Sequence, residues 1–222
     1  MNNTIHQFWM GGELDILGLM SAKSIIKQGH ELSLWSYDKI EFLSTELCLA
    51  LNNANKVLDL SEVPDCAKCP YIGRPYEQIV SEFFRYKVLH KYGGWWLDND
   101  IVLLNKLFWE YPIGVRGINK GAYPNVIYVE ESNSQLMLDC FNNLSLTKWN
   151  ASINVQLFEH KIENWKIPDY WFGKECNINY FRDVKIVPPR MGVHLCRSWA
   201  QRLELLDRKV GLYGKLRKTY KV

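Results

Sequence analysis

The chain has 222 residues, 47% of them hydrophobic and 23% charged, which is enough apolar material for the core of one domain. Its net charge is only +3 and it carries no nucleic-acid-binding motif, which argues against a nucleic-acid partner. No apolar stretch approaches the roughly 20 residues that cross a bilayer. Residues 1–4 show no basic region followed by an apolar run, so we expect a cytoplasmic protein with reduced thiols.

Two strands are predicted near the N-terminus, at residues 4–10 and 31–35. The first is rich in Ile, Phe and Trp and is closed by a Gly-Gly pair. The end of such a strand is where a doubly wound sheet opens its ligand crevice. Trp9 and Trp35 are therefore candidates for stacking on a nucleobase. The alternative is that both are core residues, because Trp is highly buried on average.

A long helix is predicted over residues 76–92, with a broad apolar face and an end at Gly93. Glu82 and Arg85 are three residues apart, so they share a helical face that is directed toward the following strand. Two interpretations fit this pair. It holds a polar ligand beside a metal-phosphate site, or it is a structural ion pair at the helix surface.

The most informative segment follows Gly93 and Gly94, where an apolar strand runs into Asp98-Asn99-Asp100. Successive strand residues point to opposite faces, so Asp98 and Asp100 are predicted to share one side while Asn99 faces away. Two such carboxylates can bind one hard divalent cation, Mg2+ or Mn2+, whose shell a substrate's phosphates complete. Taken alone, Asp-x-Asp is a weak signal, because short motifs have many false positives.

The remaining elements complete an α/β pattern. Strands and helices alternate through about the first hundred residues, which predicts a nucleotide-binding, mostly parallel sheet flanked by helices. Helical patterns follow at residues 134–146 and 151–161, then a short strand at 184–187. We therefore expect one domain at residues 1–207 and a basic C-terminal tail at residues 208–222.

The predicted tail contains six basic residues and no acid, so the positive net charge of the chain is a property of this segment. Apolar residues are interleaved with the basic ones. Such a segment can lie on an anionic membrane surface, where each basic residue contributes about 1 kcal/mol. The alternative is a solvated, frayed chain end.

Three groups of residues occur together in an order typical of one family. They are the central SEFFR and YGGWWLDND at residues 81–85 and 92–100, the N-terminal residues 5–12 and 34–38, and the late HLCRSW at residues 194–199. Together they resemble the DXD-motif sugar transferases of glycosyltransferase family 32. That family includes bacterial capsule and O-antigen enzymes and the yeast initiation-specific mannosyltransferase, and the clostridial glucosylating toxins are more distant relatives. The resemblance implies a single GT-A domain, a Mn2+ or Mg2+ ion and a nucleotide-sugar donor.

The resemblance also implies residue roles. Asp100 would bind the metal directly, Asp98 would contact the metal site and the donor ribose or sugar, and Glu82 with Arg85 would hold sugar hydroxyls. Glu82 stands where the family usually has Asp, a departure that bears on which sugar is accepted. His194, or alternatively Ser198, would be a further metal ligand. The residues expected to contact the donor are Gln7, Phe8, Trp9, Ser36, Tyr37, Ser81, Trp96, Asn99, Asn125, Ser198 and Trp199.

The sequence thus predicts a metal-dependent, retaining glycosyltransferase that moves a sugar from a UDP- or GDP-sugar to a glycan. A lipid-diphosphate-linked glycan of bacterial surface polysaccharide is the expected acceptor. One alternative is a metal-dependent nucleotide-sugar phosphodiesterase or pyrophosphatase, which would usually need more carboxylates around paired metals. The other is a non-catalytic sugar or nucleotide binder, because fold alone does not fix function.

Overall fold

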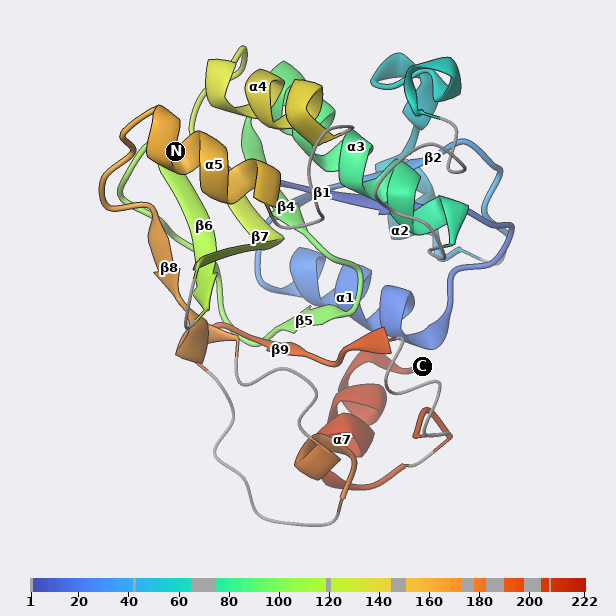
Figure 1. The fold of residues 1–222 in the computed structure, drawn as a ribbon. Helices are drawn as coiled ribbons and strands as arrows, with labels where there is room; N and C mark the ends of the chain where they lie inside the picture. The colour runs from blue at the N-terminus through green and yellow to red at the C-terminus, as the bar shows by residue number, and fades with distance from the viewer. Residues whose placement is uncertain are drawn as a thin grey trace.

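A seven-stranded sheet in the order β3-β2-β1-β4-β7-β6-β8 lies at the centre of the computed structural model (Figure 1). Its strands are β1 (Thr4–Trp9), β2 (Glu31–Ser36), β3 (Leu51–Asn53), β4 (Gly94–Leu97), β6 (Ile113–Ile118), β7 (Gly121–Val129) and β8 (Lys166–Pro168). Strand β1 runs parallel to β2 and β4, β2 to β3, and β6 to β8. Only β7 is antiparallel to its neighbours β4 and β6 within this described sheet. The predicted mostly parallel α/β sheet is therefore confirmed.

The structure describes residues 2–41, 43–64, 75–118, 121–144, 151–172, 178–182, 190–197, 205–207 and 209–222. The strand expected at 184–187, Ser198 and Trp199 lie outside these residues.

Helices cover both faces of the sheet. The helices are α1 (Ile16–Lys27), α2 (Thr45–Ala50), α3 (Tyr76–Tyr92), α4 (Gln135–Asn143), α5 (Ala151–Glu159) and α7 (Gly211–Tyr220), with short 3-10 turns η1 (Ala54–Lys56), η2 (Leu60–Glu62), η4 (Asp169–Trp171) and η5 (Ile178–Phe181). Helices α3, α4 and α5 lie on one face and α1 on the other, and α7 packs outside α1 (Figure 1). A separate antiparallel pair, β5 (Ile101–Leu103) and β9 (Gly192–His194), lies beside α1.

Helix α3 has the bounds that its sequence predicts. Its apolar residues are buried, and it ends at Gly93, whose φ of 65° lies in the left-handed region that glycine adopts readily. Gly94 also has a positive φ, and a Cβ there would stand 2.7 Å from the Thr4 carbonyl oxygen. Two consecutive glycines therefore let the chain turn directly from α3 into β4, against β1.

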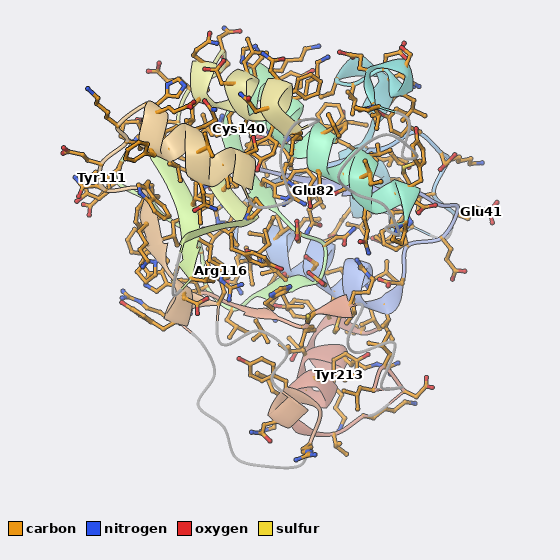
Figure 2. The ribbon with its side chains drawn as sticks, viewed as in Figure 1. Glu41, Glu82, Tyr111, Arg116, Cys140 and Tyr213 are labelled. Carbon is orange, nitrogen blue, oxygen red and sulfur yellow. The ribbon has the colours of Figure 1, made fainter. Side chains whose placement is uncertain are left out.

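The basic C-terminal segment is part of the folded core from Gly211 onward. On α7, Tyr213, Leu216 and Tyr220 are buried, and the Tyr220 hydroxyl donates to the Leu103 carbonyl at 3.1 Å. Figure 2 shows Tyr213 within the lower part of the molecule. The frayed-end alternative is therefore wrong for this helix. None of the described helices is long and apolar enough to cross a bilayer.

Candidate active site

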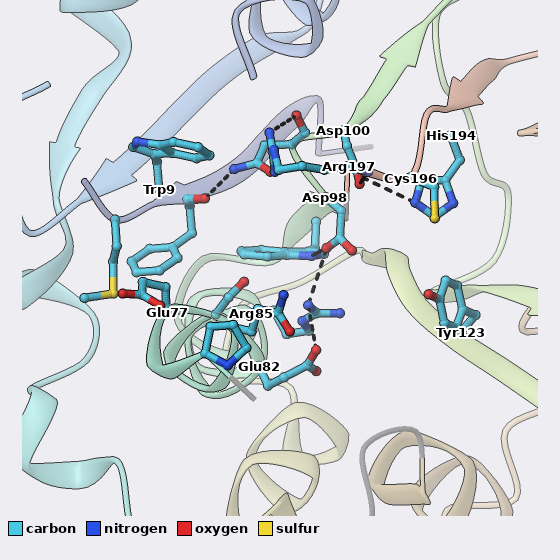
Figure 3. A pocket seen from close by; sticks show the side chains of 17 residues that line it. Trp9, Glu77, Glu82, Arg85, Asp98, Asp100, Tyr123, His194, Cys196 and Arg197 are labelled. Atoms are coloured by element: carbon cyan, nitrogen blue, oxygen red, sulfur yellow. Dashed lines mark hydrogen bonds and ion pairs between the residues drawn. The ribbon is translucent and has the colours of Figure 1, made fainter. Parts of the chain in front are cut away.

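A pocket of about 450 Å³ opens at the carboxyl ends of β1 and β4. The sheet order reverses at this point, with β2 and β3 on one side of β1 and β4 on the other, which is where ligands bind in open α/β sheets. The lining side chains include Phe8, Trp9, Ser81, Glu82, Arg85, Trp96, Asp98, Asn99, Asp100, Tyr123, His194, Cys196 and Arg197. Figure 3 shows that α3, the segment after β4 and the segment after β9 supply the charged ones.

Asp98 and Asp100 lie in a turn and not, as the sequence predicted, in a continuing strand. Strand β4 ends at Leu97, and the Ile101 amide donates to the Asp98 carbonyl oxygen at 3.0 Å. Side chains in a turn do not alternate between two faces, so the predicted geometry was wrong. Both carboxylates nevertheless line the pocket, and so does Asn99.

The two carboxyl groups have different surroundings. Asp98 accepts from the Trp96 indole nitrogen at 2.8 Å and lies 3.4 Å from an Arg85 Nη atom, but burial and the nearby Asp100 charge raise its pKa. Burial alone would also raise the pKa of Asp100, yet His194 and Arg197 together lower it below its ordinary value. Asp100 is therefore the carboxyl group that is held firmly in the anionic state.

Strand pairing brings His194 to Asp100. Ile101 of β5 pairs with His194 of β9, and His194 Nε2 lies 3.4 Å from Asp100 Oδ1 (Figure 3). This oxygen is buried and has no partner that meets hydrogen-bond geometry among the described residues. Two ligands at right angles around one octahedral ion, each about 2.1 Å from it, lie about 3 Å apart. The separation and the unsatisfied oxygen fit a divalent cation bound between these two side chains.

A cation here would need further ligands from outside the protein. Among the described residues, no group of three or more His, Cys, Asp and Glu side chains forms a metal site by itself. Mg2+ commonly binds one or two carboxylates and takes its remaining ligands from water and substrate phosphates. The sparse protein ligand set therefore fits a metal that binds together with a phosphorylated substrate.

Glu82 and Arg85 form a buried ion pair at the wall of the pocket. An Arg85 Nη atom lies 3.1 Å from Glu82 Oε1, and the other donates to the Pro124 carbonyl oxygen at 2.6 Å. Their side chains are only 5% and 4% exposed, so the interpretation as a surface pair is wrong. Burial alone would lower the pKa of Arg85, but Glu82 and Asp98 raise it. Arg85 is therefore a permanent cation, stacked over Trp96 at 5.2 Å.

Several residues that the sequence predicted to contact the nucleotide-sugar donor line the pocket: Phe8, Trp9, Ser81, Trp96 and Asn99. The Asn99 amide is already engaged, because it donates to the Phe8 carbonyl oxygen and accepts from Arg197. Asn99 thus joins β1 to the segment after β9.

Besides Asn125, which is described below, three residues predicted to contact the sugar donor do not line the pocket. Gln7 faces α1, where its amide donates to Ser21 at 2.7 Å, because neighbouring strand residues point to opposite faces and Phe8 takes the pocket side. Ser36 is buried and accepts from the Asp38 amide. Tyr37 donates to the Leu58 carbonyl oxygen and packs edge-on against Phe8. Gln7, Ser36 and Tyr37 therefore support the pocket from behind.

The structure adds Arg197, for which the sequence suggested no role. Its guanidinium contacts both carboxylate oxygens of Asp15, at 2.6 and 2.9 Å, and stacks over Trp9 at 4.9 Å. Its backbone amide donates to Asp100 Oδ2 at 2.8 Å. Because Asp15 and Arg197 lie 182 positions apart, no local pattern indicates this contact.

Arg116 is a second addition, a fully buried residue of β6 that is labelled in Figure 2. It donates to Asp169 at 2.8 Å, and one Nη atom lies 3.4 Å from His194 Nδ1. Asn125, which the sequence assigned to the donor, does not line the pocket. It contacts the same His194 nitrogen at 3.3 Å.

The sequence matches a known family, and the fold resembles that of a known glycosyltransferase. Residues 19–132, just over half of the chain, match the family described as the glycosyltransferase sugar-binding region containing the DXD motif. Among solved structures, the PaToxG glycosyltransferase is similar in fold, with a TM-score of 0.51 and 15% identity over 72% of this chain and 69% of that one. Another structure, described only as a transferase, has a TM-score of 0.48 and 12% identity over 72% and 84% of the two chains. No curated protein matches the sequence significantly. With Asp98 and Asp100 inside the matched region, the chain belongs to the family of DXD-motif glycosyltransferases.

Proposed function

We propose that this chain is a metal-dependent glycosyltransferase that transfers a sugar from a nucleotide-sugar donor to a hydroxyl group of a glycan. The observation that carries this proposal is the anionic Asp100 opposite His194, in a pocket that also contains a buried Glu82–Arg85 pair. The membership of glycosyltransferase family 32, within the broader DXD group, is part of the same proposal and rests on the motif resemblance.

Different charged side chains would hold different parts of the nucleotide-sugar donor. Asp100 and His194 would hold Mn2+ or Mg2+, which supplies a Lewis acid for the departing diphosphate. Glu82 and Arg85 would hold hydroxyl groups of the transferred sugar, because they offer a carboxylate acceptor and a fork of donors side by side. Asp98, beside them, would contact the ribose or the sugar. We propose retention of anomeric configuration and assign no nucleophile.

The aromatic end of the pocket would receive the nucleobase. Trp9 and Phe8 lie at the end of β1, and Arg197 covers one face of Trp9, so a base would stack on the opposite face. Ser198 and Trp199 follow Arg197 directly in the sequence. They are proposed to close over the donor diphosphate.

The acceptor proposed from the resemblance is a lipid-diphosphate-linked glycan of bacterial surface polysaccharide, on the cytoplasmic side of the membrane. Helix α7 supports peripheral membrane contact, because its apolar side is buried while Lys215 and Lys218 are exposed, with Lys209 and Lys221 exposed beside it. Anionic lipid attracts such cations.

A donor screen without acceptor tests the reaction class. We expect Mn2+-dependent hydrolysis of one UDP- or GDP-sugar that releases the nucleoside diphosphate and free sugar, and EDTA should stop it. Release of nucleoside monophosphate and sugar phosphate would instead identify the pyrophosphatase alternative. Tight binding of a nucleotide sugar with no product, with or without glycan acceptors, would identify the non-catalytic alternative.

A further inference from the structure

Asn125 touches the side of the His194 ring that faces away from Asp100. Its backbone carbonyl accepts from the Asp98 amide at 3.0 Å, which places the residue directly behind the DXD turn. Asn125 is 1% exposed, and its amide nitrogen lies 3.3 Å from His194 Nδ1. Its amide oxygen is buried and has no hydrogen-bond partner among the described residues.

The orientation of this amide decides which ring nitrogen carries the proton. If the Asn125 NH2 group donates to His194 Nδ1, the ring proton must be on Nε2, where it points at Asp100 and prevents metal binding. If the amide is turned by 180°, its oxygen accepts a proton on Nδ1 and leaves the Nε2 lone pair facing Asp100. The two orientations have nearly the same shape, so the surrounding hydrogen bonds determine which one is populated.

Arg116 favours the first arrangement when no metal is bound. A guanidinium can only donate, and its Nη atom lies 3.4 Å from His194 Nδ1. Its other nitrogens are held by Asp169 at 2.7 and 2.8 Å, so the guanidinium stays beside Nδ1 and disfavours a proton on that nitrogen. Asn125 differs from Arg116, because a single rotation of its side chain places an amide oxygen, which is an acceptor, beside His194 Nδ1.

We propose that Asn125 is a positioning residue whose amide turns with the metal, accepts the Nδ1 proton of His194 and so directs the Nε2 lone pair to the cation. This inference rests on the proposed metal site. It assigns Asn125 to the metal and not to the donor sugar, and it makes the buried Arg116 the group that favours the metal-free tautomer. Residues that orient a metal-binding His in this way commonly change metal affinity 10- to 100-fold when substituted.

The first measurement is Mn2+ affinity, determined with Mn2+ alone by electron paramagnetic resonance. Asn125→Leu removes the acceptor and should weaken binding about tenfold or more. Asn125→Asp provides a permanent acceptor and should keep or strengthen it. The control is Asn154→Leu, because Asn154 also supports β7, through hydrogen bonds to the Ala122 backbone at 2.8 and 3.2 Å. Its Mn2+ affinity should equal that of the unaltered chain.

The second measurement is the His194 tautomer, read from 15N shifts of the labelled imidazole, because added negative charge alone could strengthen Mn2+ binding to the Asp variant. Diamagnetic Mg2+ at saturation should move the proton from Nε2 to Nδ1 in the unaltered chain. Asn125→Asp should show the proton on Nδ1 without metal. A proton that stays on Nε2 at saturating Mg2+, or undiminished Mn2+ affinity in Asn125→Leu, would overturn the proposal.

Asp100→Asn separates this inference from the proposed function. If it abolishes Mn2+ binding while Asn125→Leu does not, the metal site stands and the role of Asn125 is wrong. If Asp100→Asn leaves Mn2+ binding unchanged, the metal site itself is wrong.

Discussion

Two carboxyl groups only two residues apart have pKa values shifted in opposite directions, and this difference predicts unequal effects of the same substitution. Asp100 is kept anionic by His194 and Arg197, whereas burial raises the pKa of Asp98. Asp100→Asn removes the stable charge without changing side-chain volume, so turnover should fall by at least about 100-fold, a loss of several kcal/mol in transition-state stabilisation. The melting temperature should change little, because the side-chain oxygen of the new Asn can still accept from the Arg197 backbone N–H.

EDTA should reproduce the effect of Asp100→Asn in the unaltered chain, and Mn2+ should restore activity there but not in the variant. Asp98→Asn should instead show mainly weaker donor binding. Normal turnover of Asp100→Asn at saturating donor would refute its role at the metal.

The Glu82–Arg85 pair predicts a change in sugar preference. Arg85 uses its guanidinium for Glu82, for Asp98 and for the Pro124 carbonyl, an arrangement that an ammonium group cannot reproduce. Arg85→Lys should therefore lower turnover by about 10- to 100-fold, the equivalent of one lost hydrogen bond to a charged group. Glu82→Asp should reorder the preferred donor sugars, measured as relative kcat/KM across a panel. An unchanged order with equal loss of melting temperature in both variants would mean that the pair is purely structural.

At the level of elements, β9 and the residues that follow it are held beside the pocket by the pairing of β9 with β5 and by the contacts of Arg197. Arg197→Ala removes the contacts to Asp15 and Trp9 and should loosen the segment. We expect faster tryptic cleavage at Arg190 and a higher KM for the donor, because segments that complete a site are among the less stable parts of a fold. Lys218→Ala, an exposed change on α7, is the matched control and should alter neither.

A nucleoside diphosphate with Mn2+ should slow cleavage at Arg190 in the unaltered chain, and the same nucleotide with EDTA should not. Cleavage and KM unchanged in Arg197→Ala would show that strand pairing alone holds the segment.

The same elements show how far local sequence carries a structural prediction. Helix α3 and its Gly93–Gly94 turn were predictable, because apolar periodicity and glycine at a helix end are local signals. The turn at Asp98 was mistaken for strand, since three residues cannot reveal a period of two. The contacts of Arg197 with Asp15 and of Arg116 with His194 join residues 182 and 78 positions apart. Such pairs become visible only when the sheet and the β5–β9 pairing are in place.

Considered as a whole, the molecule builds its pocket on the junction of β1, β2, α3 and β4, and one buried histidine ties these elements together. His6 Nδ1 accepts from the Trp35 indole at 3.1 Å, and its Nε2 contacts the Gly93 carbonyl oxygen at 3.0 Å. Because Nδ1 accepts, the ring proton is on Nε2 and is donated to Gly93. The neutral ring therefore links two strands to the turn between α3 and β4.

This burial predicts how stability depends on pH. Burial lowers the pKa of His6 from 6.5 to about 4, so between these values the unfolded chain binds a proton that the folded chain does not. Stability from this group is fully present above pH 6.5 and is lost as the pH falls toward 4, by about 2 kcal/mol between pH 7 and pH 5. His6→Gln cannot titrate, so its free energy of unfolding, measured with urea at several pH values, should fall less over this range by that amount. The variant should also be less stable at pH 7, because the Trp35 contact is disturbed.

His30, whose pKa is lowered by burial as well, is present in both proteins, so the difference between the two pH profiles reports His6 alone. Parallel profiles would show that His6 takes up its proton at the same pH in the folded and unfolded chains, and that the junction behind the pocket is open to water.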